Sequence, residues 1–361
     1  MANIMKNNLM KKYPFKAFLY PTLSCNLNCK MCYSRGYNNS EETICELSYE
    51  QYTSIIDKLI SIGVSIFDIS GGEPLLRNDI LEICKYIKIN PKSKIHFVSN
   101  GTLICKKFEV FRELLPYIDL LKISIDSPIP YKHNKIRGLN NAFQLTDSGI
   151  KMLIQEGFSN IGVNFVLMKS NYNDVINMLE YCLDLGIKSI NLLQLLNVSP
   201  KGDLKEEVLS EPSIIELVSQ IEKWIDEKEK SKLTNFFSIT LVTHGALFPY
   251  IKVNKYRQKR ISFFIEYDPL RGCSAFSNSI VISNKGDIFG CTAMLNNSDF
   301  YIGNIINMTV SQIQQNRTRF IEKINKREQL MKSKCNYCNS WSSCKGGCPC
   351  MPNSCINLFQ G

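Results

Sequence analysis

The first 200 residues alternate short apolar, β-branched runs with longer stretches in which apolar residues recur every three or four positions. The short runs predict strands and the longer stretches predict helices. The predicted strands are Phe15–Leu23, Val64–Ser70, Lys94–Ser99, Asp119–Ile125, Asn160–Met168 and Ile187–Gln194. Because strands that alternate with helices pair in parallel through right-handed crossovers, we expect an α/β fold, a partial (β/α)6 barrel of the TIM type.

The helices of these repeats carry signals of their own. Ser48-Tyr-Glu-Gln51 is typical of a capping box at a helix N-terminus. Other helices are expected to start near Asn78 and to cover Ala142–Glu156. Ligands of such barrels bind at the C-terminal ends of the strands, so polar or glycine-rich segments that follow a strand are the candidate site.

The repeat pattern ends at Pro200-Lys-Gly202. A charged helix is expected around Ser213–Lys230, and a less regular stretch follows it. The C-terminal segment is rich in Cys, Asn, Ser and Gly and shows few long helical patterns. We therefore predict a barrel over residues 1–200, a helical or irregular connector over 201–268, and a small domain over 269–361 held by metal rather than by a large core.

The composition is that of a soluble globular protein, with 44% hydrophobic and 21% charged residues in a chain of 361. The net charge of +10 is spread along the chain, which indicates solubility or attraction for an acidic partner such as an acidic peptide segment. We find no nucleic-acid motif, no apolar run long enough to span a membrane and no signal peptide. We therefore expect a cytoplasmic protein that binds neither nucleic acid nor membrane.

The chain has fifteen cysteines, of which three lie within residues 25–32 and eight within 273–355. Thiols stay reduced in the cytoplasm, so clusters at short spacings favour metal binding over disulfides. Sites rich in thiolates select zinc or iron–sulfur clusters. The cysteines are therefore the main candidates for chemistry.

The first group, Cys25-x3-Cys29-x2-Cys32, directly follows the first predicted strand. Three thiolates can bind three irons of a four-iron cluster and leave the fourth iron open. A structural zinc site prefers four ligands, and no fourth ligand is nearby in the sequence. The motif and its position resemble the signature of the radical S-adenosylmethionine (SAM) superfamily. The resemblance implies that SAM binds the open iron and that Met31, where the family usually has an aromatic residue, contacts adenine.

Further motifs follow the later strands. Ser70-Gly-Gly-Glu-Pro74 resembles the family's GGE motif, which implies that Glu73, with the backbone at Gly71 and Gly72, binds the SAM amino group; a plain turn is the alternative. The resemblance assigns other polar residues to the SAM ribose or the substrate cavity, and an arginine to the SAM carboxylate. The polar residues are Ser99, Asn100, Ser124 and Asp126, and the arginine is Arg137. Each has an alternative role as a helix cap, turn residue or solvated charge. We interpret His96 as a core residue and leave His133 unassigned.

The C-terminal cysteines follow a longer pattern. Cys273 precedes Gly286 and then Cys291, and Cys335, Cys338, Cys344 and Cys348 follow at x2, x5 and x3 spacings before Cys350 and Cys355. The order resembles the SPASM domain, which holds two auxiliary clusters in many radical SAM enzymes. A zinc ribbon built from Cys335, Cys338, Cys344 and Cys348 is the alternative, but it leaves Cys273 and Cys291 unexplained.

The SPASM resemblance assigns ligands to both auxiliary clusters. It gives Cys273, Cys291 and Cys348 to an inner cluster, and Cys335, Cys338, Cys344 and a last cysteine to an outer cluster. We favour Cys355 as that last ligand, because Cys350 lies only two residues beyond Cys348. No other cysteine occurs between 259 and 290, so the fourth iron of the inner cluster is open, or binds a non-cysteine side chain or the substrate. The resemblance thus implies three [4Fe-4S] clusters.

The family resemblance implies an enzyme that reductively cleaves SAM to a 5′-deoxyadenosyl radical, which then abstracts a hydrogen atom from the substrate. The commonest role of SPASM enzymes predicts a ribosomally synthesised peptide substrate and a thioether or carbon–carbon crosslink. The alternatives are a small-molecule substrate such as a sugar, nucleoside or cofactor precursor, a peptide epimerase, or a non-catalytic scaffold. Thr292 stands where anaerobic sulfatase-maturating enzymes have a catalytic aspartate, which argues against that activity. Expected partners are a flavodoxin- or ferredoxin-type reductant and a separate peptide-recognition protein.

Overall fold

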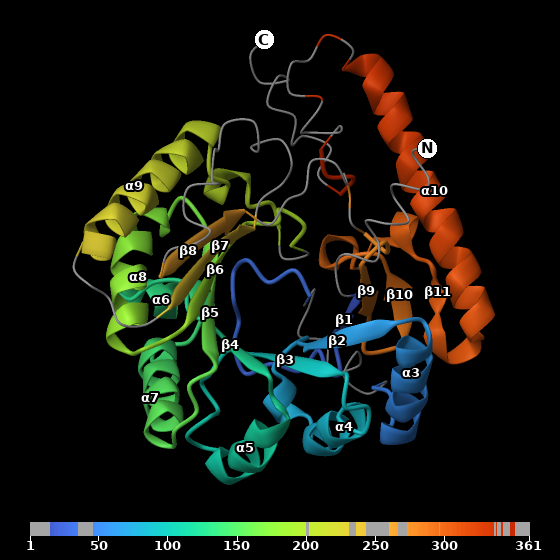
Figure 1. Cartoon of the computed structure of the whole chain (residues 1–361), viewed down its shortest axis with the longest axis horizontal. Helices are drawn as coiled ribbons and strands as arrows, with labels where there is room; N and C mark the ends of the chain where they lie inside the picture. Colours follow the sequence, from blue (N-terminus) through green and yellow to red (C-terminus); the bar gives the residue numbers. More distant parts are fainter. Residues whose placement is uncertain are drawn as a thin grey trace.

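A computed structural model describes residues 15–34, 46–199, 202–230, 236–242, 260–265, 273, 275–295, 297–335, 337, 341 and 347–350. In these residues the chain forms one eleven-stranded sheet, in the order β11-β10-β9-β1-β2-β3-β4-β5-β6-β7-β8. Figure 1 shows the sheet curving around a central space, with the helices on its outer side. The strands that the structure describes show no pairing between β8 and β11, so the curve stays open. The predicted α/β partial barrel is confirmed.

All six predicted strands are present. They are β1 Phe15–Leu19, β2 Val64–Ile69, β3 Lys94–Ser99, β4 Leu120–Ser124, β5 Ile161–Leu167 and β6 Ser189–Gln194. Each pairs in parallel with the next along the chain. Their carboxyl ends therefore meet at one edge of the sheet, where the polar motifs were predicted to gather.

The α-helices and 3-10 turns of the repeats connect these strands. They are α3 Tyr49–Ser61, η1 Pro74–Leu76, α4 Ile80–Ile87, α5 Phe108–Leu114, η2 Leu115–Tyr117, α6 Pro130–Arg137, α7 Ala142–Gln155, η3 Tyr172–Asp174 and α8 Val175–Asp184. The predicted capping box is confirmed at α3, where Ser48 Oγ accepts a hydrogen bond from Gln51 N and Gln51 Oε1 accepts one from Ser48 N at 2.8 Å. Helix α7 likewise begins at its predicted residue.

The segment expected to be helical or irregular adds to the barrel. After η4 Lys205–Glu207 and α9 Glu211–Lys230, strands β7 Phe237–Val242 and β8 Ile261–Ile265 continue the parallel sheet beyond β6. Neither strand was predicted, because both are short runs in a stretch without the helical repeats that marked the earlier βα units. The predicted domain boundaries at 200 and 268 stay predictions.

The C-terminal segment lies at the other end of the sheet. Strand β9 Ser279–Ile282 pairs in parallel with β1, and β10 Asp287–Phe289 and β11 Gly303–Asn304 extend the sheet antiparallel. The turns η6 Thr292–Met294, η7 Ser298–Phe300 and η8 Ile305–Asn307 lead to α10 Val310–Lys334, a helix of 25 residues. Helix α10 was not predicted, because it is mostly polar and its sparse apolar residues gave little periodic signal.

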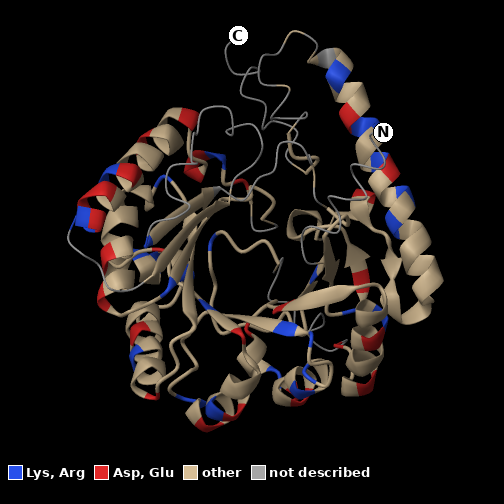
Figure 2. Ribbon diagram, in the orientation of Figure 1, with Lys and Arg blue, Asp and Glu red and all other residues tan. Residues whose placement is uncertain are grey.

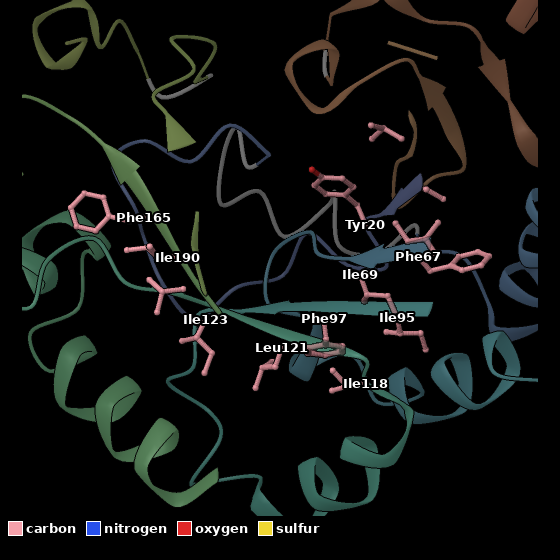
Figure 3. Close-up of a cluster of buried hydrophobic side chains, with 14 of the residues drawn as sticks. Tyr20, Phe67, Ile69, Ile95, Phe97, Ile118, Leu121, Ile123, Phe165 and Ile190 are labelled. Atoms are coloured by element: carbon pink, nitrogen blue, oxygen red, sulfur yellow. The ribbon is translucent and has the colours of Figure 1, made fainter. Parts of the chain in front are cut away.

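The main hydrophobic core lies between the sheet and the outer helices. Figure 3 shows Phe97, Leu121 and Ile123 among the buried side chains of this layer. Phe320 and Ile324 of α10 belong to the same continuous core. The described part of the C-terminal segment therefore shares the core of the barrel, whereas we had expected metal rather than a large core to hold it.

Charged side chains lie mainly on the outside of the molecule. Figure 2 shows Lys and Arg interspersed with Asp and Glu along the helices, α9 and α10 included. This mixed distribution fits the interpretation of the net charge as solubility. Among the described residues, no helix has the length and apolar character needed to cross a membrane.

Candidate functional site

The loop after β1 carries Cys25, Cys29 and Cys32, and helix α6 holds it in place. Asn28 N donates to Arg137 O at 3.1 Å, and Lys30 N donates to Ile136 O at 3.2 Å. Gly138 ends α6 with φ +69°, and a Cβ there would lie 2.6 Å from Asn28 O. The glycine therefore allows α6 and the cysteine loop to approach closely.

Each of the three thiols has a polar neighbour. Asn100 Nδ2 lies 3.9 Å from Cys25 Sγ, and Arg137 NH1 lies 3.8 Å from Cys29 Sγ. Ser34 Oγ lies 3.5 Å from Cys32 Sγ. Burial raises the pKa of the Cys29 thiol, while Arg137 acts in the opposite direction. Such donors and a nearby cation stabilise thiolates, the form that binds iron.

These thiols fit an iron–sulfur cluster by their number, their loop and their donors. No three His, Cys, Asp or Glu side chains of the described part are already arranged around one metal position. The fit therefore rests on the chemistry of the three thiols and their neighbours.

The glycines after β2 bring that strand end against the cysteine loop. Gly72 N donates to Thr22 O at 2.8 Å, and Glu73 N donates to Ser24 O at 2.7 Å. A Cβ on Gly72 would lie 2.0 Å from Ser24 O, and one on Gly71 would lie 2.4 Å from Thr22 O. The structure thus explains both glycines by contact with the segment that leads into Cys25.

Glu73 is a fully buried carboxylate surrounded by donors. It accepts hydrogen bonds from Ser99 Oγ at 3.0 Å, from Asn100 N at 2.8 Å and from Leu75 N at 3.3 Å. Burial raises the pKa of Glu73 to about 7, although these hydrogen bonds lower it. An ammonium group beside Glu73 would favour the ionised form, so the site is chemically suited to an amine.

Asn100 connects Glu73 to the cysteine loop. Its backbone N–H binds Glu73, while its Nδ2 donates to Asn26 Oδ1 at 3.0 Å and lies next to Cys25 Sγ. Thr102 completes the group, because Asn26 Nδ2 donates to its Oγ1 at 2.8 Å. Asn26 was not among the site residues predicted from the sequence, although it directly follows Cys25.

Asp126 and Arg137 form a buried ion pair with 2.7 Å between Oδ2 and Nε. Asp126 Oδ1 also accepts from Val166 N at 2.9 Å, and His133 Nδ1 accepts from Asp126 N at 3.2 Å. The structure thus gives Arg137 a carboxylate partner within the chain and explains His133 as a support for Asp126. Contacts of Arg137, Asp126 and Ser124 with SAM or substrate stay predictions.

Met31 lies in a small apolar cluster separate from the main core. It packs with Ile136, Met168 and Leu195, the last two just beyond the ends of β5 and β6. This places Met31 at the edge of the sheet where ligands of parallel barrels bind. Its predicted contact with adenine stays a prediction.

A second polar group lies on strands β2, β3 and β4. Lys122 Nζ lies 2.8 Å from Asp68 Oδ2, and His96 Nδ1 lies 3.8 Å from the same oxygen. Although burial raises it, Lys122 and His96 hold the pKa of Asp68 well below its usual range. His96, which we interpret as a core residue, lies half-buried in β3 beside this carboxylate. The signal was a polar residue inside each of three predicted strands.

Tyr33 lies near both groups of cysteines. Its hydroxyl is 2.9 Å from that of Tyr20. Burial raises the pKa of Tyr33 to about 12, and negative charge on Cys32 or on Cys291 acts in the same direction. The Tyr33 ring is therefore within electrostatic reach of the N-terminal and the C-terminal thiols.

Four of the five described C-terminal thiols lie close together. Cys273 is within electrostatic reach of Cys291 and Cys348, and the Cys350 thiol hydrogen-bonds to both Cys291 and Cys348. Cys335 directly follows α10. The other predicted ligands, Cys338, Cys344 and Cys355, lie outside the described residues.

Comparisons with known proteins agree with this geometry. Residues 19–193 match the family model of the radical SAM superfamily, and residues 273–339 match the SPASM iron–sulfur cluster-binding domain. An AdoMet-dependent heme synthase of Methanosarcina barkeri is 28% identical over 332 residues, which cover 90% of this chain and 88% of that protein.

Two solved structures resemble the whole fold. Streptococcus suis SuiB bound to precursor peptide SuiA has a TM-score of 0.69 at 18% identity, and the match covers 96% of this chain and 75% of SuiB. Native anSMEcpe with bound AdoMet and Cp18Cys peptide has a TM-score of 0.68 at 20% identity, and the match covers 96% and 91% of the two chains. At these identities the likeness is one of fold.

Proposed function

We propose that this protein modifies a peptide. The chain belongs to the radical SAM superfamily and carries a SPASM domain, so it is an enzyme that binds SAM and [4Fe-4S] clusters. The observation that carries this proposal is the likeness of fold over 96% of the chain to two enzymes solved with peptides bound. The net charge of +10 also suits an acidic peptide segment.

Cys25, Cys29 and Cys32 hold the first cluster in this proposal. When bound, the cluster supplies the electron that cleaves SAM to a 5′-deoxyadenosyl radical. The Glu73 carboxylate binds the SAM ammonium, and its hydrogen bonds from Ser99 and Asn100 fix its orientation. Asn100 Nδ2 at Cys25 and Arg137 at Cys29 stabilise the thiolates.

The proposed reaction abstracts a hydrogen atom from a carbon of the peptide and ends in a thioether or carbon–carbon crosslink. A flavodoxin- or ferredoxin-type protein supplies the electron, and a separate protein contributes peptide recognition. A crosslink lowers the mass of the peptide by two hydrogen atoms, whereas epimerisation leaves the mass unchanged. Mass therefore distinguishes these outcomes.

A small-molecule substrate is the second candidate. The observation that favours it is the heme synthase relative, which is 28% identical over 90% of this chain. Under this alternative the substrate is a cofactor precursor, the class to which a heme precursor belongs. The same site residues would bind SAM, and the difference would lie in the substrate.

The test uses anaerobically reconstituted protein with SAM and dithionite. The substrates are a set of synthetic cysteine-containing peptides with acidic leader segments and, in parallel, a set of tetrapyrrole precursors. We expect 5′-deoxyadenosine to form and a peptide to lose two hydrogen atoms, while Cys29→Ala yields neither. Turnover of a tetrapyrrole precursor without change in any peptide would contradict the peptide proposal and support the second candidate.

A further inference from the structure

Four C-terminal cysteines from three segments of the chain converge beside the barrel. The Cys350 thiol contacts those of Cys291 and Cys348, and Cys273 lies close to the same two thiols. Cys273, Cys291 and Cys350 also pack against the edge of the main core. Cys350 therefore belongs to the group of thiols that the sequence assigned to the inner auxiliary cluster.

Hydrogen bonds fix the three segments relative to one another. Phe276 N donates to Gly290 O at 2.9 Å, which brings the chain after Cys273 alongside the residue before Cys291. Helix α10 contacts the segment of Cys273 and the segment of Cys348 and Cys350, because Cys273 N donates to Glu328 Oε1 at 3.3 Å and Arg327 NH1 donates to Gly347 O at 3.4 Å. The convergence thus depends on the same helix that shares the barrel core.

The short spacing of Cys348 and Cys350 is compatible with binding to one cluster. Residues 347 and 348 have no regular structure, and Pro349 and Cys350 form a turn that brings the Cys350 thiol back to that of Cys348. From spacing alone, we had disfavoured Cys350 as a ligand because it lies so close to Cys348. In the structure the Cys350 thiol contacts those of both Cys348 and Cys291.

We propose that Cys350 is the fourth thiolate ligand of the inner auxiliary cluster, together with Cys273, Cys291 and Cys348. A cluster with four thiolates has no iron open to a substrate thiol, so its role is electron transfer rather than substrate binding. This replaces the three alternatives that the sequence left for the fourth iron, namely an open position, a non-cysteine side chain or the substrate, and it leaves Cys355 to the outer cluster. The proposal goes beyond the proposed function and holds for a peptide or a small-molecule substrate.

The test is spectroscopic and needs no substrate. A Cys25→Ala/Cys29→Ala/Cys32→Ala background removes the first cluster, so the reconstituted full chain should hold about eight irons in the two auxiliary clusters. We compare this background with versions that also carry Cys350→Ala or the control Cys105→Ala, a half-buried cysteine outside the group. Cyanide is the probe for an open iron, and electron paramagnetic resonance of the reduced protein is the readout.

We expect cyanide to leave the spectra of the background and of Cys105→Ala unchanged. In Cys350→Ala, the spectrum of one cluster should shift when cyanide is added. On mild oxidation the same cluster should lose one iron and become a [3Fe-4S] cluster. A cyanide response in the background, or a Cys350→Ala spectrum identical to that of Cys105→Ala, overturns the proposal.

Loss of a whole cluster in Cys350→Ala is also informative. The spectrum that remains is then compared with those of Cys291→Ala and Cys338→Ala in the same background. A match to Cys291→Ala supports the proposal, because the inner cluster has been lost. A match to Cys338→Ala overturns it, because Cys350 then serves the outer cluster.

Discussion

Glu73 is a buried carboxyl whose proton affinity bears directly on its proposed role. Its pKa of about 7 in the folded protein means that it is mainly protonated below neutral pH. Because the pKa of Glu73 is higher in the folded than in the unfolded protein, the protonated carboxyl contributes stability that is fully present at pH values below the unfolded pKa. This contribution disappears as pH rises through about 7. Binding of an ammonium needs the ionised form, so the two effects have opposite pH dependence.

We therefore expect SAM affinity to fall as pH drops below neutral. Each pH unit below the pKa should raise the SAM dissociation constant about tenfold, because the proton must first leave Glu73. Calorimetric titration of the anaerobic, cluster-loaded protein between pH 6 and 8 measures this. Glu73→Gln should bind SAM more weakly and without this pH dependence, since its amide places a donor against those of Ser99, Asn100 and Leu75. An equal slope in Glu73→Gln would exclude Glu73 as the titrating group.

The Asp126–Arg137 pair should stabilise the fold strongly as a pair. Removing one partner, by Asp126→Asn or Arg137→Met, leaves the other polar group buried without its partner and should cost about 3–5 kcal/mol. The double variant should cost clearly less than the sum of the two. Urea unfolding of the cluster-loaded protein checks this, and Lys151→Met, at an exposed pair with Asp147, serves as a control with little effect. Strictly additive losses would show that the pair does not interact as the geometry indicates.

Single site residues were predictable from motifs, but the contacts between them were not. Glu73 and Cys25 were both predicted, yet the link through Asn100 and Asn26 depends on how two strand ends meet in space. Cys350 was set aside on spacing alone, and only the folded chain places its thiol beside Cys291. A motif of neighbouring residues can be recognised in the sequence, whereas hydrogen bonds between distant segments can be identified only once the fold is known.

At the scale of elements, the approach of β2 to the cysteine loop depends on Gly72. We expect Gly72→Ala to displace the segment before Cys25, because its Cβ would lie 2.0 Å from Ser24 O and 2.6 Å from Leu23 O. The variant should lose the first cluster, about four irons per chain, and keep the auxiliary clusters. Iron analysis with electron paramagnetic resonance measures this.

Gly63→Ala is the matched control for that prediction. Gly63 has φ +93°, but among the described residues no atom lies within 4 Å of the position that a Cβ would take, so the substitution strains the backbone without a steric clash. It should destabilise the fold by about 1 kcal/mol and leave the iron content unchanged. Full iron content in Gly72→Ala would show that the close approach is not required.

Elements with strong periodicity were predictable and those without it were not. Strand β3 matches its predicted bounds because apolar and polar residues alternate and turn signals flank it. Strands β7 and β8 are short, and α10 is largely polar, so their local patterns were weak. These three elements form through pairing and packing with the rest of the chain, which tertiary contacts determine.

At the scale of the whole molecule, the C-terminal segment and the barrel are joined by pairing, packing and charge. Strand β9 pairs with β1, and Lys58 Nζ of α3 donates to Ile305 O at 2.8 Å. From α10, the Arg317 guanidinium lies 4.2 Å from the Phe15 ring centroid of β1. Because these contacts cross from one segment to the other, we expect the two to unfold as a cooperative unit.

Phe320 of α10 provides the test of this cooperativity. Its ring packs against that of Phe276 with 6.0 Å between centroids, and Phe320→Ala should cost about 3–5 kcal/mol. If the segments unfold together, the loss reaches the barrel, and amide hydrogen exchange of the cluster-loaded protein should accelerate in β1 and β2 as well as in α10. Leu330→Ala, at a position of the same helix that is 69% exposed, should change exchange little. Faster exchange confined to α10 would mean that the barrel keeps its stability when the packing of α10 is weakened. The two segments would then not unfold as one cooperative unit.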